Sequence, residues 1–355
     1  MSATPPGRGG SHARPTILTL SRAAGVSAST VSRALKNDPR ISAATRRRIA
    51  LLAAEAGYTP DAVARTLSGG RSGLIGLVLG DVHNPFYPEL LQEAVAQAAE
   101  RGLRLLLLHV GAGPIEDRTA EALLHYRVEG ALITSAELSS RAAEICAANG
   151  VPVVMVNRVP RLHASAVSCD NAEGGRQLAE FLLRGGHRRF AVVRGTPGTS
   201  TSAERERGFA EVLSREGMEV MATFEGGSTY EGGFAAGERL AASAGRDRPD
   251  AVFAVNDIMA MGLADALRLA GVKVPEDISI VGFDDIAAAA RPPYRLTTVA
   301  QPLQAMVRRG FDLLMGRMAA PSLGGESILL RGRLIIRTSA RCEASGGVVG
   351  AASRR

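Results

Sequence analysis

The chain of 355 residues contains little cysteine and no hydrophobic run long enough to cross a membrane. Its three cysteines, Cys146, Cys169 and Cys342, have neither paired nor metal-ligand spacing, and an odd number argues against a disulfide framework. We therefore expect a reducing, cytoplasmic location and no metal site. Residues 1–14 contain no apolar stretch, so we expect a disordered extension and not a signal peptide, with a second disordered segment at 343–355.

The sequence also lacks the motifs of common enzyme classes. It contains no Gly-x-Ser-x-Gly nucleophile elbow, no phosphate-binding loop ending in Gly-Lys-Ser/Thr and no histidine pair at metal-ligand spacing. We therefore expect no enzymatic activity and no cofactor.

Positive charge is concentrated at the amino-terminal end of the chain. Residues 1–72 contain 11 Lys and Arg against 3 Asp and Glu, a net charge of +8, whereas residues 73–355 contain 31 against 32, a net charge of −1. This asymmetry indicates a polyanionic partner for the first segment and a different role for the remainder.

Residues 25–33 have the pattern of a tight turn followed by a short helix. Gly25 permits a sharp bend, and Ser27 can cap the second helix by accepting a bond from its backbone N–H groups. Val31 and Leu35 lie one turn apart and are expected to face inward. A helix whose outer face carries small polar groups and one arginine suits a DNA major groove. That outer face comprises Ala28, Ser29, Ser32 and Arg33.

After the basic segment, continuous apolar runs alternate with helical patterns. Such runs are typical of parallel strands that are buried on both faces. The first series occupies residues 74–79, 105–108, 131–133 and 153–156, and the second occupies 190–193, 251–255 and 278–281. The sequence therefore predicts an α/β fold with two doubly wound parallel-sheet lobes, preceded by a small all-α helix-turn-helix segment.

Polar residues follow most of these strands. They are Asn84 with Phe86 and Tyr87, Ser135, Asn157 with Arg158, Asn256 with Asp257, and Asp284 with Asp285. Open parallel sheets bind ligands beyond the carboxyl ends of their strands, so two facing lobes would enclose a cleft lined by these residues. Asn and Asp also serve as helix caps, but their recurrence at so many strand ends favours a binding site.

Together these features resemble the lactose/galactose/purine repressor family of bacterial transcription regulators over about Pro15 to Arg341. The resemblance implies a DNA-binding headpiece, a hinge helix and a core like that of periplasmic sugar-binding proteins. The matching motifs are Ala24-Gly25-Val26-Ser27, Thr30-Val31-Ser32-Arg33-Ala34-Leu35, Ser42 with Thr45-Arg46, Gly57-Tyr58 with Pro60, Ala64-Arg65 with Leu67, Asn84-Pro85-Phe86-Tyr87, Asn256-Asp257 with Met259-Ala260, Gly282-Phe283-Asp284-Asp285, and Gln301-Pro302.

The resemblance also implies the domain boundaries. The headpiece would occupy residues 15–60, the hinge helix and linker 61–72, and the core 73–342. We expect the first lobe of the core to comprise about 73–168 with 300–327, and the second about 169–299 with 328–342.

By motif match, ten residues are expected to contact DNA: Thr16, Ala28, Ser29, Thr30, Ser32, Arg33, Tyr58, Ala64, Arg65 and Leu67. Ala28, Ser29 and Arg33 would read base edges, and Leu67 would enter the minor groove as a wedge. Thr16, Thr30 and Tyr58 would contact phosphates, although Thr30 and Tyr58 are equally compatible with a packing role. The resemblance further implies a homodimer on an inverted-repeat operator, since one recognition helix covers half a site.

The same matching gives ten candidate effector residues: Asn84, Phe86, Tyr87, Ser135, Asn157, Arg158, Arg205, Asn256, Asp284 and Gln301. Phe86 and Tyr87 can stack on a sugar or base, and the polar groups can bond hydroxyls. Arg205 and Asp284 could instead form an ion pair between the lobes. We therefore favour a repressor whose effector is a sugar or sugar derivative. One alternative is a regulator that depends on a purine or nucleoside corepressor. A less favoured alternative is a sugar-binding protein without a regulatory role.

Overall fold

The computed structural model describes residues 15–58, 72–80, 83–111, 115–134, 139–158, 165–243, 248–320 and 325–342. The chain divides into two compact units, Met1–Ser72 and Gly73–Arg355. The predicted hinge residues Ala64, Arg65 and Leu67, the candidate effector residue Ser135 and both terminal segments lie outside the described residues. None of the helices within the described ranges has the length and apolar character that a membrane span requires.

The first unit contains three short helices, α1 (Ile17–Ala24), α2 (Ala28–Leu35) and α3 (Ala43–Glu55). Gly25 ends α1 in the left-handed conformation with φ of 63°, and the Ser27 side chain accepts a bond from the Thr30 amide, as the sequence predicts. The three helices bury one small cluster, which comprises Leu20, Ala24, Val31, Ala34, Ile49 and Ala53. Leu35, expected to be inward-facing, is half-buried at its edge.

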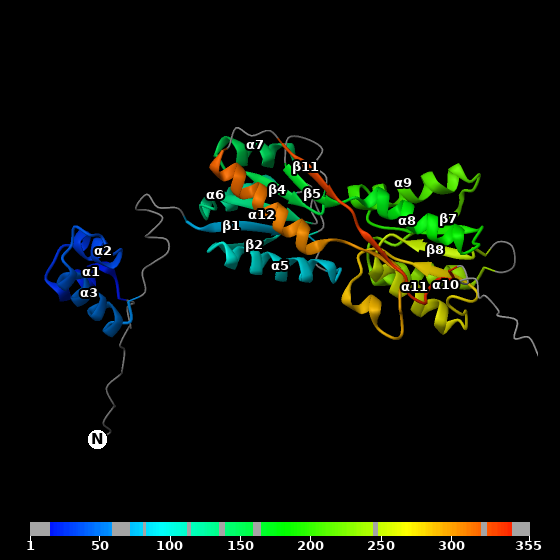
Figure 1. The fold of residues 1–355 in the computed structure, drawn as a ribbon, viewed down its shortest axis with the longest axis horizontal. Helices are drawn as coiled ribbons and strands as arrows, with labels where there is room; N and C mark the ends of the chain where they lie inside the picture. Colours follow the sequence, from blue (N-terminus) through cyan, green and yellow to red (C-terminus); the bar gives the residue numbers. More distant parts are fainter. Residues whose placement is uncertain are drawn as a thin grey trace, which may run out of the picture. The chain divides into compact units, whose positions relative to one another are not determined.

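The first lobe of the second unit is built on a six-stranded parallel sheet with the order β11-β5-β4-β3-β1-β2 (Figure 1). Its strands are β1 (Leu74–Leu79), β2 (Arg104–His109), β3 (Gly130–Thr134), β4 (Val153–Val156), β5 (Ser165–Cys169) and β11 (Ser327–Leu330). Its helices are α5 (Phe86–Glu100), α6 (Asp117–His125), α7 (Ser140–Ala148) and α12 (Leu303–Ala319).

Both faces of this sheet are covered by helices. Leu77 and Leu132 belong to the cluster that includes residues of α5 and α12, whereas their chain neighbours Val78 and Ile133 belong to the cluster that includes residues of α6 and α7. Successive side chains of a strand point to opposite faces, so both must be apolar when both faces are covered. This explains the continuous apolar runs in the sequence and confirms the predicted fold class.

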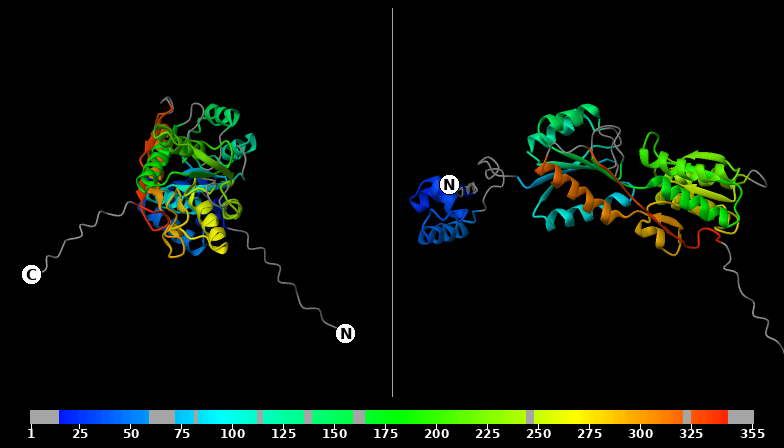
Figure 2. Two further views of the ribbon diagram at one scale, coloured as in Figure 1. Left: turned by 90° about the vertical axis from the view of Figure 1, so that its right-hand side faces the viewer. Right: turned by 45° about the horizontal axis from the view of Figure 1, so that its top comes forward.

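The second lobe repeats this architecture with a four-stranded parallel sheet of the order β7-β6-β8-β9 (Figures 1 and 2). Its strands are β6 (Phe190–Arg194), β7 (Val220–Glu225), β8 (Ala251–Ala254) and β9 (Ser279–Val281). Its helices are α8 (Asn171–Arg184), α9 (Ser200–Arg215), α10 (Tyr230–Ala241), α11 (Asp257–Leu269) and the short η2 (Ala287–Ala290). Helix α8 packs on α9, and α10 packs on α11.

Three segments carry the chain between the lobes: the β5–α8 junction, the segment after β10 (Thr298–Ala300), and the segment joining β11 to β12 (Arg333–Ile335). Strands β10 and β12 pair antiparallel. A Cβ atom placed on Gly332 would lie 3.1 Å from Cys169 Sγ and 3.2 Å from the Ala300 carbonyl oxygen, so the three segments run side by side.

The carboxyl-terminal boundary of the first lobe differs from the sequence prediction. Residues from 328 were assigned to the second lobe, but Ile328–Leu330 pair with β5 as the edge of the first-lobe sheet. Only after β11 does the chain cross over to pair β12 with β10. This strand was hard to predict, because β11 is an exposed edge strand of four residues with an alternating burial pattern.

Helices α8 and α9 approach each other closely through two glycines. A Cβ on Gly175 would lie 2.2 Å from the Arg205 carbonyl oxygen, and a Cβ on Gly208 would lie 1.9 Å from the Ala172 carbonyl oxygen. Both contacts are with backbone atoms, which cannot rotate aside. The two glycines therefore set the position of α9, including the buried Arg205.

We expect Gly208→Ala to lower the free energy of unfolding of the core by about 1–3 kcal/mol, because the added methyl group must displace α9 from α8. Urea unfolding followed by circular dichroism measures this change. Gly316→Ala is the matched control, since a Cβ at this α12 position has no atom within 4 Å. It should leave stability unchanged or raise it by about 0.5–1 kcal/mol. Equal midpoints for the two variants would contradict the packing argument.

Candidate functional site

The outer face of α2 is the candidate DNA-reading surface of the first unit. Ser29 and Arg33 are exposed there, and Ala28 and Ser32 are partly exposed. The Ser27 hydroxyl lies 2.8 Å from the Ser29 hydroxyl and 2.9 Å from the Thr30 hydroxyl, so the cap also orients the first turn. These polar groups stand at the helix N-terminus, where backbone N–H groups and the helix dipole favour phosphate.

Two predicted phosphate contacts also have structural roles. Thr16 caps α1: its hydroxyl accepts the Thr19 amide at 3.3 Å, while the Thr19 hydroxyl accepts the Thr16 amide at 2.8 Å. Tyr58 is half-buried against the headpiece cluster. The structure is compatible with both interpretations of these residues, so their phosphate contacts remain predictions.

Part of the positive charge of the first unit stabilises its own loops. Arg46 donates to the carbonyl oxygens of Asp38 and Ile41, at 3.1 Å in each case, and Arg48 donates to the Ala24 carbonyl at 2.8 Å. Hydrogen bonds from Arg40 hold the pKa of Asp38 at about 2. Arg22, Arg33, Arg47 and Arg48 are exposed on the helices, and of these Arg48 also makes the bond to Ala24.

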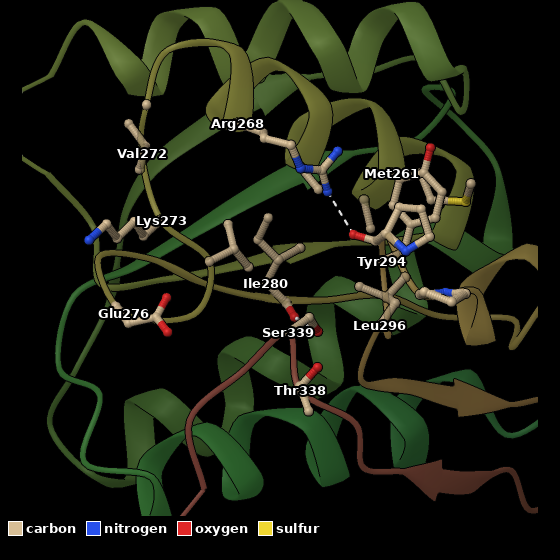
Figure 3. Close-up of a pocket in the computed structure, with 16 residues that line it drawn as sticks. Met261, Arg268, Val272, Lys273, Glu276, Ile280, Tyr294, Leu296, Thr338 and Ser339 are labelled. Atoms are coloured by element: carbon tan, nitrogen blue, oxygen red, sulfur yellow. Dashed lines mark hydrogen bonds between the residues drawn. The ribbon is translucent and has the colours of Figure 1, made fainter.

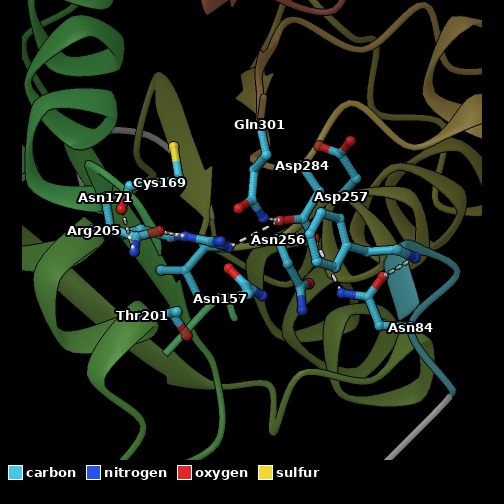
Figure 4. Close-up of polar contacts among 12 residues, drawn as sticks. Asn84, Asn157, Cys169, Asn171, Thr201, Arg205, Asn256, Asp257, Asp284 and Gln301 are labelled. Atoms are coloured by element: carbon cyan, nitrogen blue, oxygen red, sulfur yellow. Dashed lines mark hydrogen bonds and ion pairs between the residues drawn. The ribbon is translucent and has the colours of Figure 1, made fainter. Parts of the chain in front are cut away.

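The second unit contains a buried polar network centred on Asp284 (Figure 4). Asp284 Oδ1 lies 3.2 Å from Arg205 Nη1 and accepts Gln301 Nε2 at 2.7 Å, and its Oδ2 accepts Asn84 Nδ2 at 3.0 Å. Burial raises the pKa of Asp284, an effect opposed by the Arg205 charge and by these donors. Four of the predicted effector residues thus meet at one carboxylate.

Arg205 is fixed in place by several further contacts. Its Nε donates to Asn171 Oδ1 at 2.8 Å, its Nη1 donates to the Val255 carbonyl at 2.7 Å, and its guanidinium carbon lies 3.8 Å from the centre of the Phe283 ring. The expected ion pair with Asp284 forms, but it lies within the second lobe, because α9 and the segment after β9 both belong to that lobe. The interpretation as an ion pair between lobes was therefore wrong.

Hydrogen bonds between a charged and an uncharged group connect the lobes instead. Asn84 of the first lobe donates to Asp284, and Arg158, which follows β4, donates to Thr201 Oγ1 on α9 at 2.9 Å. The Ala287 amide donates to Glu89 Oε1 at 3.3 Å.

Within the described part of the chain, several buried polar atoms near the ends of the first-lobe strands have no hydrogen-bond partner. They are Thr134 Oγ1, Asn157 Oδ1, Arg158 Nε and Gln301 Oε1. Asn157 also has a left-handed backbone, with φ of 63°, and its side chain is buried. Leaving such a group unpaired costs about 1–3 kcal/mol, so this cluster favours occupation by a polar molecule.

The remaining predicted effector residues are less directly engaged. Asn256 caps α11, with its Oδ1 accepting the Met259 amide at 3.1 Å. Phe86 and Tyr87 are 2% and 8% exposed and pack edge-to-face in the core of the first lobe, with ring centres 5.5 Å apart. A stacking role for these two rings stays a prediction, and it requires that a ligand reach rings that are now largely covered.

Three polar residues of this region are not among those that the sequence predicts. Asn171 and Thr201 stand in the first turns of α8 and α9, and Asp257 begins α11. Asn171 follows β5, a short strand containing Ser and Cys that has no apolar run. Asp257 was recognised as a strand-end residue, but only its neighbour Asn256 was selected.

Asp257 is the second buried carboxylate of this region. Its Oδ1 accepts the Thr298 hydroxyl at 2.6 Å and its Oδ2 accepts the Ile286 amide at 3.0 Å. Burial and the nearby Asp284 charge raise the pKa of Asp257 to about 7. Arg205 pairs with Asp284, and this positive charge opposes the rise in the pKa of Asp284.

A hollow of about 400 Å³ lies elsewhere on the second lobe (Figure 3). Apolar groups such as Met261, Ile280 and Leu296 line it together with Arg268, which donates to the Pro293 carbonyl at 2.6 Å. None of the predicted effector residues lines this hollow. No group of three or more His, Cys, Asp and Glu suited to a metal ion occurs in the described ranges.

Asp257→Asn should change how stability depends on pH. A carboxyl group whose pKa is raised on folding contributes stability below its ordinary value, 3.8, and loses it as pH rises to about 7. The variant should therefore gain stability relative to the wild type over this window, by up to roughly 1 kcal/mol per pH unit. Urea unfolding at pH 4, 5, 6 and 7 measures the difference. Parallel stability curves would show that Asp257 is ionised throughout.

Comparison with known proteins identifies both units. Residues 16–61 match the family model of bacterial regulatory proteins, lacI family, and residues 179–340 match that of periplasmic binding protein-like domains. The chain is 33% identical over 338 residues to the HTH-type transcriptional regulator CelR of Thermobifida fusca, covering 92% of this chain and 98% of the relative. It is 33% identical to the ribose operon repressor of Escherichia coli, covering 92% and 99%.

Two solved structures extend the similarity to three dimensions. A lac repressor dimer bound to operator and the anti-inducer ONPF has a TM-score of 0.83 at 26% identity, covering 93% of this chain and all of that chain. A complex of the transcriptional regulator CelR with cellobiose has a TM-score of 0.68 at 32% identity, covering 92% of this chain and all of that chain.

Proposed function

This chain belongs to the lacI family of bacterial regulatory proteins, and from this premise we propose that it is a cytoplasmic repressor whose operator affinity is controlled by a small polar effector. It is a DNA-binding transcriptional regulator and not an enzyme, as the sequence predicts. The proposal concerns how it reads its operator, what the core binds and how the two are linked.

The buried polar atoms without partners at the first-lobe strand ends are the observation that carries the effector proposal. Two of these atoms belong to Arg158 and Gln301, whose side chains also donate hydrogen bonds to Thr201 and Asp284 of the second lobe. A polyol such as a sugar offers both donors and acceptors to such groups. The cellobiose bound to CelR and the name of the ribose operon repressor support a sugar or sugar derivative as the effector class.

The DNA-reading proposal is supported by the exposed polar face of α2 and by the net positive charge of the first unit. Arg33 suits a bidentate contact with guanine, and Ser29 beside it suits a second base or phosphate. Ala64, Arg65 and Leu67 complete the proposed contacts through the hinge. Since one recognition helix covers half a site, we expect a homodimer on an inverted repeat, as in the lac repressor dimer bound to operator.

Footprinting of the full-length protein on DNA flanking its own gene tests the proposed operator. We expect a protected region with two-fold symmetry, and sedimentation should give a dimer at the protein concentrations that protect it. A protected region without two-fold symmetry would contradict the proposal. Uniform protection that merely follows protein concentration would show nonspecific binding instead.

Arg33→Ala should weaken operator binding by about 1–3 kcal/mol and relax the preference at one base pair in each half-site, because a bidentate base contact is lost. Binding measured on operators substituted at each position shows the preference directly. Arg47→Ala is the control: it removes an exposed α3 arginine outside the α2 face and should weaken all DNA sequences alike. Equal losses on operator and random DNA for Arg33→Ala would contradict the readout role.

A further inference from the structure

The polar region between the lobes buries two guanidinium groups, and within the described residues only one of them has a carboxylate partner. Arg205 and Arg158 are 5% and 7% exposed. Arg205 pairs with Asp284 at 3.2 Å. Arg158 forms no ion pair within the described part of the chain: its Nη1 donates only to the neutral oxygens of Asn157 and Thr201, at 3.2 and 2.9 Å. A buried cation without a counter-charge is costly.

Among the residues that the structure describes, neither Asp257 nor Glu204 supplies the missing charge. Both oxygens of Asp257 accept bonds from Thr298 and Ile286, and its raised pKa leaves it partly protonated near neutral pH. Glu204, half-buried on α9, interacts with Asn171 and Arg207. The side chain next to Arg158 is the amide of Asn157, which is isosteric with a carboxylate but carries no charge.

The backbone adds positive potential at the same place. Thr201, which accepts the Arg158 bond, lies in the first turn of the 16-residue helix α9. A helix N-terminus carries partial positive charge and favours anions. The capping residue Thr199 makes no side-chain cap hydrogen bond. Arg158 is thus held against a helix end that repels it unless an anion lies nearby.

Arg158 also retains hydrogen-bonding capacity for such an anion. Its Nε is buried and without a partner, as are the neighbouring Asn157 Oδ1 and Gln301 Oε1. An anionic group accepts hydrogen bonds from a guanidinium, whereas the amide oxygens accept them from hydroxyl groups. The combination matches a molecule that carries both a charge and hydroxyls.

We propose that the effector is a polyhydroxylated anion, a sugar acid or a sugar phosphate, whose carboxylate or phosphate binds Arg158 while its hydroxyls bind Asn157 and Gln301. This inference rests on the proposed function of the lobe interface and specifies the class of its ligand. A neutral sugar would satisfy the amides but would leave the Arg158 charge uncompensated.

The test is isothermal titration of the full-length protein with two sets of probes. The anions are D-glucuronate, D-gluconate and D-glucose 6-phosphate, and the neutral set is D-glucose, D-ribose and cellobiose. We expect at least one anion to bind at least tenfold more tightly than every neutral sugar and to change operator affinity. Comparing the carboxylates with the phosphate identifies which charged group is used.

Asn157→Asp is the decisive variant, because it adds one carboxylate beside Arg158 without changing side-chain size, and Asp tolerates the left-handed backbone. It should weaken binding of the anion at least tenfold while leaving neutral sugars unaffected or bound more tightly. Arg158→Met, which keeps the length of the side chain and removes its charge, should also abolish the preference for anions. Thermal unfolding and operator binding without probe establish that each variant is folded.

Failure of this inference can be distinguished from failure of the proposed function. Tighter binding of a neutral sugar, no binding by any of the three anions at 10 mM, or unchanged anion affinity in Asn157→Asp would each overturn the anionic effector. The regulator itself would stand in those cases if the symmetric footprint is observed. Loss of the symmetric footprint would overturn the proposed function whatever the core binds.

Discussion

The core of this protein depends on an ion pair and hydrogen bonds that balance the charge of one buried carboxylate, Asp284. Asp284 is 6% exposed and receives bonds from Arg205 on α9, from Gln301 at the crossover into α12 and from Asn84 at the start of the first lobe. An uncompensated buried charge destabilises a fold by several kcal/mol. Helix α9, the crossover and the first-lobe loop must therefore be placed together, and any change in one changes the surroundings of the carboxylate.

The two arginines of the region differ in how they are held. Arg205 bonds Asp284, Asn171 and the Val255 carbonyl and lies over Phe283, all within the second lobe. Arg158 belongs to the first lobe and donates one hydrogen bond to an uncharged group of the second lobe, the Thr201 hydroxyl. A ligand that binds the free Nε of Arg158 engages the same guanidinium that makes this contact. It would therefore alter a bond between the lobes without disturbing the charge pair that stabilises the second lobe.

The sequence predicted the features that arise from local chemistry. The turn at Gly25, the cap at Ser27 and the central strands followed from conformational preference and from apolar runs, and the structure has them where they were expected. Strands β5, β7 and β11 were not predicted, because they are short, contain polar residues or lie at sheet edges where one side is exposed. Alternating burial over four to six residues is a weak signal beside the continuous runs of central strands.

The site was predictable in its residue types but not in its connections. Position at a strand end selected Asn84, Asn157, Asn256 and Asp284, because parallel sheets place their carboxyl ends at one edge. The predicted lobe boundaries already place Arg205 and Asp284 in the second lobe, but nothing in the sequence showed that Asn84 makes the connection between lobes. Such pairings join residues as many as 200 positions apart. They form only when the three connecting segments bring the two lobes together.

The place where the chain enters the core restricts how a ligand could act on the headpiece. The second unit begins at Gly73, whose amide donates to Glu129 Oε1 at 2.6 Å, immediately before the amino-terminal end of β1. Asn84 and Asn157 lie beyond the opposite, carboxyl ends of β1 and β4. A strand of six residues spans about 20 Å, so Gly73 and these two asparagines lie at opposite ends of the first-lobe sheet. Because helices pack on both faces of the first-lobe sheet, we expect the sheet to move as one rigid unit. Under the proposed function, a ligand at these strand ends would therefore affect Gly73 only by displacing the first-lobe sheet relative to the second lobe.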